Sequence, residues 1–152
     1  MSQPRWAVVV PVKRLAAAKS RLRGALPGVP HEELALALAA DTLRAVLACP
    51  AVAEALVVTD DTRVVAAARA AGAGTVPDVP DAGLNAAFRH GAAQISGRWV
   101  AGLTADLPAL RPAELADALL AAQCDTEGVR RFVADVPGGG TVLLAAPPGV
   151  DL

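Results

Sequence analysis

The sequence predicts an α/β fold built on a mostly parallel sheet. Short apolar runs rich in Val alternate along the chain with Ala- and Leu-rich segments in which apolar residues recur at helical spacing. This alternation favours parallel strands joined by right-handed crossovers. With 152 residues and a net charge of −1, the chain is expected to form one domain over residues 1–152, without a basic bias toward nucleic acid.

The first strand is expected in the run Ala7–Pro11, which is apolar and β-branched. Pro11 ends it, because proline cannot donate to a sheet ladder. The same kind of pattern predicts further strands at 54–59, 74–76, 98–104, 131–135 and 141–146. Helical periodicity predicts helices at 31–49, 63–71, 84–95 and 112–123.

Residues at the ends of these segments support the assignments. Glu32 and Glu33 lie in the positive first turn of the first helix. Asp60 and Asp61 are placed to cap the second helix, and Gly72 follows it, where glycine is favoured. The last two strands flank a Gly-rich turn, which predicts a hairpin.

Composition excludes several classes of protein. Hydrophobic residues make up 54% of the chain, but no charge-free apolar run reaches the roughly 18 residues that a membrane span needs. The apolar start is too short for a signal peptide, and positive charge follows it. Cys49 and Cys124 have no metal or redox spacing, which favours a reduced cytoplasm. His31 and His90 are isolated, so neither suggests a catalytic dyad.

A cationic segment, residues 13–21, follows the first strand. Lys13, Arg14, Lys19 and Arg21 occur there with no acidic residue among them. In an open α/β sheet, ligands collect beyond the carboxyl ends of central strands. Four cations at such a place suit a polyanion such as a nucleoside triphosphate. The alternative is a solvated basic turn with apolar spacers.

An acidic residue follows the strand expected at 98–104. Asp106 lies in a short loop that Pro108 closes, so its carboxylate is placed to hold a divalent cation. Magnesium takes only one or two carboxylates, while phosphate and water complete its octahedron, so no dense acidic cluster is needed. The alternative is an ordinary aspartate in a turn.

The segment PVKRLAAAKSRL, residues 11–22, resembles the first signature of the guanylyltransferases that activate phosphoenolpyruvate or 2-phospho-L-lactate in the biosynthesis of the deazaflavin coenzyme F-420. The resemblance extends over most of the chain, from Ala7 to Leu144. It implies a Rossmann-like nucleotidyltransferase fold of GT-A type with three α/β/α layers, similar to that of the molybdopterin-cofactor guanylyltransferases.

The resemblance also implies roles for particular residues. It assigns Lys13, Lys19 and Arg21 to the triphosphate of GTP. Asp106, within LTADLPAL, resembles the magnesium ligand of the family's third signature. Lys13, Lys19 and Asp106 are therefore the expected catalytic set, and Mg²⁺ is the expected cofactor.

Two further stretches resemble family signatures. Gly83-Leu84-Asn85 resembles the second, a loop and helix start that lies against the nucleotide. The amide of Asn85 offers both a donor and an acceptor for base or ribose edges, although an Asn near a helix start also commonly caps. FVAD…GGGT resembles the fourth, which assigns Thr141 to the acid substrate, with Gly140 offering close backbone approach to an anion. Gly139 stands where relatives often have Thr. The alternative to a substrate-binding role for this stretch is a plain hairpin turn, which a run of three glycines also forms.

The implied reaction joins GTP to phosphoenolpyruvate or 2-phospho-L-lactate. A phosphate oxygen of the acid attacks the α-phosphorus of GTP, and pyrophosphate leaves. The nucleophile is already an anion at neutral pH, so the site needs charge neutralisation and positioning rather than a general base. We expect a cytoplasmic protein with no nucleic-acid or membrane partner. The sequence does not decide between a monomer and a homodimer.

The family pattern continues beyond Leu152, with an Arg-Phe-Gly-Pro-x-Ser type segment and an acidic pair. We therefore expect a chain that is C-terminally incomplete relative to the family, either a fragment or a truncated gene product. A truncated, non-catalytic nucleotide-binding remnant is the alternative function. A dinucleotide-dependent oxidoreductase is disfavoured, because the turn after the first strand lacks G-x-G-x-x-G.

Overall fold

The structure, a computed structural model, describes residues 5–124 and 128–152. Its strands are β1 (Trp6–Pro11), β2 (Val52–Val58), β3 (Gly74–Val76), β4 (Trp99–Leu103), β5 (Arg131–Ala134) and β6 (Thr141–Ala146). Its helices are α1 (His31–Ala48), α2 (Thr62–Ala71), α3 (Leu84–Ala93) and α4 (Pro112–Gln123), with a short 3-10 helix, η1 (Ser20–Leu22). Each expected helix and strand is present with small shifts at its ends. The helix η1 was not predicted.

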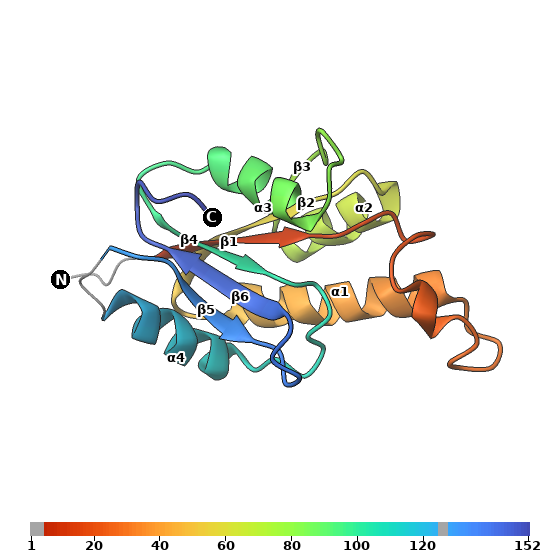
Figure 1. The fold of residues 1–152 in the computed structure, drawn as a ribbon. Helices are drawn as coiled ribbons and strands as arrows, with labels where there is room; N and C mark the ends of the chain where they lie inside the picture. The colour runs from red at the N-terminus through yellow and green to blue at the C-terminus, as the bar shows by residue number, and fades with distance from the viewer. Residues whose placement is uncertain (1–4, 125–127) are drawn as a thin grey trace.

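The strands form one six-stranded sheet in the order β3-β2-β1-β4-β6-β5. The first four strands in that order run parallel, and β6 and β5 complete the sheet as an antiparallel hairpin. Helices lie on both faces of the sheet, as Figure 1 shows. The three α/β/α layers and the mostly parallel sheet that the sequence predicts are therefore confirmed.

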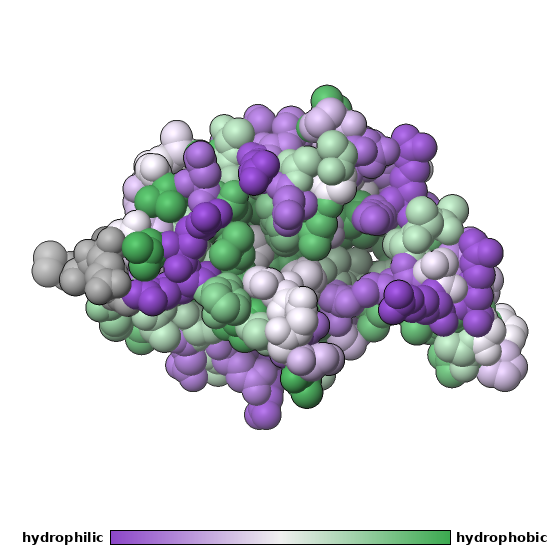
Figure 2. All heavy atoms as spheres, in the orientation of Figure 1, coloured by the Kyte–Doolittle hydropathy of each residue, from purple (hydrophilic) through white to green (hydrophobic). Residues whose placement is uncertain are grey.

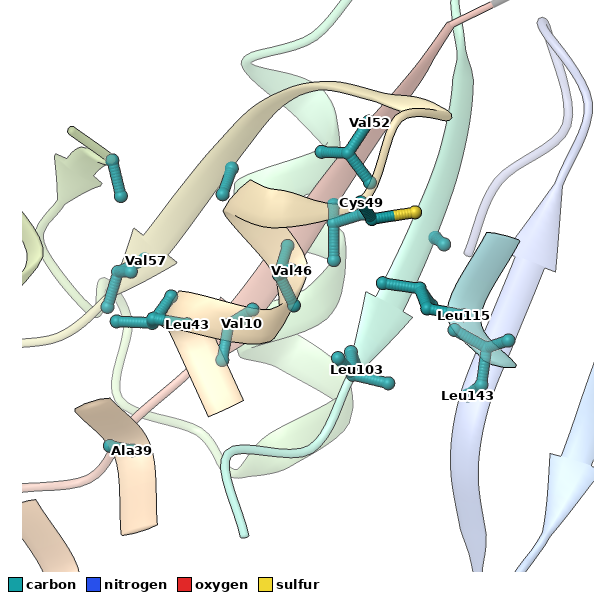
Figure 3. Packing of buried hydrophobic residues seen from close by; sticks show 14 of the residues in the cluster. Val10, Ala39, Leu43, Val46, Cys49, Val52, Val57, Leu103, Leu115 and Leu143 are labelled. Carbon is teal, nitrogen blue, oxygen red and sulfur yellow. The ribbon is translucent and has the colours of Figure 1, made fainter. Parts of the chain in front are cut away.

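Strand β1 lies at the centre of the sheet and is covered on both faces. Trp6, Val8 and Val10 belong to the larger core cluster, beneath α1, α2 and α4. Figure 3 shows this packing, with Leu43 of α1 lying close to Val10. The intervening Val9 points to the opposite face, where α3 covers it. Full burial on both faces explains the continuous apolar run that predicts this strand.

Two glycines let α3 approach the sheet closely. A Cβ on Gly91 would lie 2.4 Å from Val9 Cγ1 and 2.9 Å from Val58 Cγ2. A Cβ on Gly102 of β4 would lie 2.6 Å from a ring carbon of Phe88. Side chains of normal size at these positions would push α3 outward, so the glycines fix the height of α3 above β1 and β4.

The segment between β1 and α1 projects from the body of the molecule at the right of Figure 1. Figure 2 shows both hydrophilic and hydrophobic residues on this projecting part. Its position follows from the sheet, because it begins at the carboxyl end of the central strand β1. Among the helices in the described residues, none combines the length and the apolar composition needed to cross a membrane.

Candidate active site

Two segments that are far apart in the sequence meet beyond the carboxyl ends of neighbouring strands. Parallel β1 and β4 pair from Trp6 opposite Trp99 to Val9 opposite Gly102. The chain therefore leaves both strands at the same edge of the sheet. The segment after β1 carries the four cations, and the segment after β4 carries Asp106. Cations and carboxylate share this edge, as expected.

Lys19 and Asp106 form an ion pair at this edge, in which Lys19 Nζ donates to Asp106 Oδ2. Both side chains keep contact with solvent, with 42% and 35% of their surface exposed. Burial raises the pKa of Asp106, but the Lys19 ammonium, both as a hydrogen-bond donor and as a charge, contributes to a net pKa below the ordinary value. Asp106 is therefore a carboxylate at neutral pH.

Lys19 also has an uncommon backbone conformation, with φ 53° and ψ 38°, in the left-handed region. Among the described residues, the other non-glycine residue with positive φ is Asp81, at 55°. Both residues line cavities at the same edge of the sheet. Such conformations cost of order 1–3 kcal/mol each and tend to cluster where ligands bind.

Three cavities adjoin at Leu84, the first residue of α3, which lines all of them. The Asp106 cavity, of about 300 Å³, includes Lys13, Lys19 and Asp106 in its lining. The Asp78 cavity, of about 440 Å³, includes Lys13, Arg14, Asp60, Asp78 and Asp81. The Thr141 cavity, of about 390 Å³, includes Asn85, Gly140 and Thr141. Lys13 lines two of these cavities and Leu84 lines all three, so the cavities are immediate neighbours.

The Asp78 cavity balances acidic and basic groups. Asp78 N–H donates to Asp60 Oδ1 at 3.0 Å, and the Arg14 guanidinium lies 3.9 Å from Asp60 Oδ2. Burial raises the pKa of Asp78, and the negative charges of Asp81 and Asp60 raise it further. Lys13 and Arg14 are thus already close to negative groups of the protein at this cavity.

Buried polar contacts hold the loops that carry these side chains. Thr42, fully buried in α1, accepts a hydrogen bond from the Leu107 N–H at 3.0 Å. This contact fixes the residue next to Asp106. His31 Nε2 lies 3.1 Å from the Ala16 carbonyl oxygen, which ties the cationic segment to the start of α1.

The structure brings together most of the residues that the sequence singles out. Lys13, Lys19 and Asp106 line one cavity. Arg14 lies at the adjoining Asp78 cavity. Arg21 is exposed on η1 and lines none of the three cavities, so the structure does not place it with the other cations.

Asn85, Gly140 and Thr141 line the Thr141 cavity together, although they come from two different signatures. The alternative role of Asn85 as a cap is wrong, because Gly83 is the N-cap of α3 and no side chain caps this helix. The Gly140 N–H donates to Asp135 Oδ1 at 3.0 Å, so this amide already has a partner.

Sequence reasoning missed the acidic side of the site. The sequence predicts that Asp60 and Asp61 cap the second helix, but Asp61 alone is the N-cap of α2. Asp60 instead holds Asp78 and faces Arg14. The available signal was position: Asp60 follows β2, which pairs in parallel with β1, so it reaches the same sheet edge as the cations.

The residues around Asp106 limit the kind of metal site that they can form. Within residues 5–124 and 128–152, no group of three or more His, Cys, Asp or Glu side chains is arranged to hold a metal ion. Asp106 offers one charged carboxylate beside a cavity. This does not fit an all-protein cage. It fits a magnesium ion that takes its remaining ligands from phosphate and water.

Comparisons with known proteins bear on the family and the fold of the chain. The family described as "Guanylyl transferase CofC like" matches residues 6–149. The chain is 68% identical to the phosphoenolpyruvate guanylyltransferase of Salinispora arenicola, over 97% of this chain and 68% of that protein. It is 53% identical to the one of Streptomyces coelicolor, over 97% and 70%. Its fold resembles a solved nucleotidyl transferase from Methanothermobacter thermautotroptrophicus, with a TM-score of 0.65, 22% identity and coverage of 94% and 71%.

Proposed function

This chain belongs to the CofC-like guanylyl transferase family, and we propose that it transfers a guanylyl group from GTP to phosphoenolpyruvate. The products are pyrophosphate and a guanosine diphosphate-linked form of the acid, a step in the biosynthesis of coenzyme F-420. The observation that carries the proposal is that Lys13, Lys19 and Asp106 line one cavity. The names of the relatives favour phosphoenolpyruvate over 2-phospho-L-lactate as the acceptor.

In the proposed reaction, a phosphate oxygen of phosphoenolpyruvate forms a bond to the α-phosphorus of GTP. The bond between that phosphorus and the oxygen bridging to the β-phosphorus breaks, and its electron pair leaves with pyrophosphate. The attacking oxygen carries no proton that must be removed. The protein therefore has to bring two anions together and stabilise the charge that develops on the leaving group.

The cationic segment is suited to that task. Lys13 lines both the Asp106 and the Asp78 cavities, so its ammonium is placed where a triphosphate passing between them would lie. Lys19 lies beside it at Asp106. We assign Lys13 and Lys19 to the phosphates of GTP, and Arg21 to the outer phosphates, although the latter lies outside the cavity lining.

Asp106 would hold the magnesium ion, which when bound neutralises phosphate charge and aligns the α-phosphoryl group for in-line attack. The carboxylate is ionised at neutral pH, because the Lys19 ammonium helps to keep its pKa low. Thr42 holds the neighbouring Leu107 through a hydrogen bond, so the loop that presents the carboxylate has a fixed position.

The Thr141 cavity is the proposed place of the acid substrate. Thr141 offers a hydroxyl, and Asn85 offers an amide that can contact either the acid or the ribose. Gly140 lines the cavity, but the expected approach of an anion to its backbone is not supported, because its N–H donates to Asp135 Oδ1 and the Asp135 carboxylate fills the space beside its Cα. Leu84 separates this cavity from the Asp106 cavity and lines both.

The two cysteines are compatible with the cytoplasm, which we propose as the location. Cys49 and Cys124 are free thiols, the first buried and the second exposed. Burial raises the pKa of the Cys49 thiol, so it stays protonated near neutral pH. A reducing compartment suits a chain whose thiols are not used for cross-linking.

The test is a pyrophosphate-release assay with GTP, Mg²⁺ and phosphoenolpyruvate, run beside calorimetry with GTP and Mg²⁺. We expect release that depends on both substrates, and a loss of at least about 100-fold in the Asp106→Asn variant. A parallel run with 2-phospho-L-lactate identifies the acceptor. Binding of GTP without any release would contradict the proposal and support a non-catalytic nucleotide-binding protein.

A further inference from the structure

One carboxylate joins the cationic segment to the start of α2. Asp61 Oδ1 accepts hydrogen bonds from the Arg63 N–H at 2.9 Å and the Val64 N–H at 3.3 Å, which caps the helix. Asp61 Oδ2 accepts a third hydrogen bond, from the Leu15 N–H, at 2.8 Å. Oδ1 of Asp61 thus caps α2, and Oδ2 holds the cationic segment through Leu15.

Leu15 is a fixed point of that segment. Its side chain is 2% exposed and packs in the larger core cluster. A second fixed point lies just before it, where the Val12 N–H donates to the Val58 carbonyl at 2.9 Å. Lys13 and Arg14 lie between these two points, with exposed side chains. The positions of both cations therefore depend on both anchors.

Asp61 is itself held firmly. Its N–H donates to Thr59 Oγ1 at 3.1 Å, and Thr59, which is buried, donates its own N–H to the Val76 carbonyl at 3.0 Å. Burial raises the pKa of Asp61, but the hydrogen bonds from Leu15, Arg63 and Val64 outweigh it, so the net pKa is lowered. An ionised acceptor makes the stronger kind of hydrogen bond.

We propose that Asp61 is a positioning residue for nucleotide binding, whose second carboxylate oxygen holds Leu15 so that Lys13 faces the triphosphate. This inference rests on the proposed function. A helix cap needs one acceptor oxygen, whereas Asp61 uses both. Without the second oxygen, the part-buried Leu15 N–H has no acceptor, and the segment must move to regain one.

The test separates the two oxygens. In Asp61→Ser, the serine hydroxyl can still cap the helix. Its side chain is shorter and has one oxygen instead of two, so it cannot also accept the hydrogen bond from the Leu15 N–H. We expect the KM for GTP to rise about tenfold, the size expected for a lost charge-assisted hydrogen bond, while the KM for phosphoenolpyruvate stays unchanged. The melting temperature should fall by about 2–6 °C, because the helix cap remains but the part-buried Leu15 N–H loses its acceptor.

Val64→Ala is the matched control on the same helix. Val64 is buried, so its truncation should lower the melting temperature by about 5 °C while leaving the contact between Asp61 and Leu15 in place. We expect its KM for GTP to equal that of the wild type. If Val64→Ala raises the KM for GTP as much as Asp61→Ser does, Asp61 acts through stability alone and the proposal is wrong.

A measurement without substrate keeps this inference separate from the proposed function. Amide hydrogen exchange of residues 13–19 should speed up in Asp61→Ser and not in Val64→Ala. If the wild-type chain fails to bind GTP, the proposed function fails, whether or not the exchange changes. If GTP binds and exchange at residues 13–19 is unaffected by Asp61→Ser, the positioning role is refuted.

Discussion

Lys19 and Asp106, which lie 87 positions apart in the chain, form an ion pair between the segments that follow β1 and β4. The pair shows that the two charged groups singled out in the sequence reach the same cavity. It also means that the carboxylate expected to bind a cation is already balanced by one. Binding of a metal ion at Asp106 would therefore compete with Lys19 and release its ammonium for the phosphates.

Lys19→Ala should lower catalysis without unfolding the protein. The expected loss in kcat/KM is about 100-fold, because the variant removes a charge that we propose to act on the leaving pyrophosphate. The melting temperature should change little, because a partly exposed ion pair contributes at most about 1 kcal/mol. Steady-state pyrophosphate release and thermal unfolding measure both effects. Arg21→Ala is the matched control, with a smaller expected loss. Full turnover in Lys19→Ala would remove Lys19 from the catalytic set.

The same variant should bind a divalent cation more tightly in the absence of nucleotide. Lys19 competes for the Asp106 carboxylate, so its removal should lower the Kd for Mn²⁺ by up to about tenfold. Electron paramagnetic resonance of free Mn²⁺ measures this binding directly. Lys13→Ala removes an equal charge from the same cavity without breaking the pair, and should have a smaller effect. If Lys19→Ala and Lys13→Ala lower the Kd for Mn²⁺ equally, the effect comes from the loss of a positive charge near the cavity, and Lys19 does not compete for the Asp106 carboxylate.

Thr141→Val should affect the acid substrate rather than the nucleotide. The variant keeps the shape of the side chain and removes the hydroxyl, so the KM for phosphoenolpyruvate should rise about tenfold. Calorimetric titration should give an unchanged Kd for GTP. Asn85→Ala, at the same cavity, then shows which ligand the amide contacts. A Thr141→Val protein with a weakened Kd for GTP would assign this cavity to the nucleotide.

Gly91→Ala should destabilise the fold even though alanine favours helix by about 1 kcal/mol. The new Cβ would lie 2.4 Å from Val9 Cγ1, on a stiff β-branched side chain of the central strand. We expect a net loss of about 1–3 kcal/mol in the free energy of unfolding. Urea denaturation measures it. Ala93→Gly, on the exposed side of α3, tests helix propensity without this contact.

Acid should weaken the contacts of Asp61 and Asp106. Both carboxyl groups have pKa values below the ordinary 3.8, so the unfolded chain binds more protons as the pH falls toward that value. Their contribution to stability is complete above the unfolded pKa and is lost as the pH falls through the lower, folded pKa. Urea denaturation should show that these two carboxyl groups do not make the free energy of unfolding depend on pH above about pH 5. The Asp61→Asn, Asp106→Asn double variant should have a shallower acid limb than the wild type.

Much of the fold could be predicted because its signals are local. The buried strand at Trp6–Pro11, the Gly72 helix end and the hairpin of β5 and β6 depend on residues close together in the chain. The unpredicted helix η1 begins at the end of the cationic segment, where the sequence has neither helical periodicity nor a cap. The family resemblance added the cations and Asp106, which local patterns alone left undecided.

The sequence by itself determined the order and kind of the elements, the charges of the cationic segment and the family, because periodicity, turn residues and motifs are properties of short stretches. The tertiary structure alone decided which of those residues meet. The Leu15 N–H donates to Asp61, 46 positions away in the sequence, and Lys19 forms an ion pair with Asp106, 87 positions away. These contacts depend on β1 lying between β2 and β4 in the sheet, and strand order is fixed by packing over the whole domain rather than by any single segment.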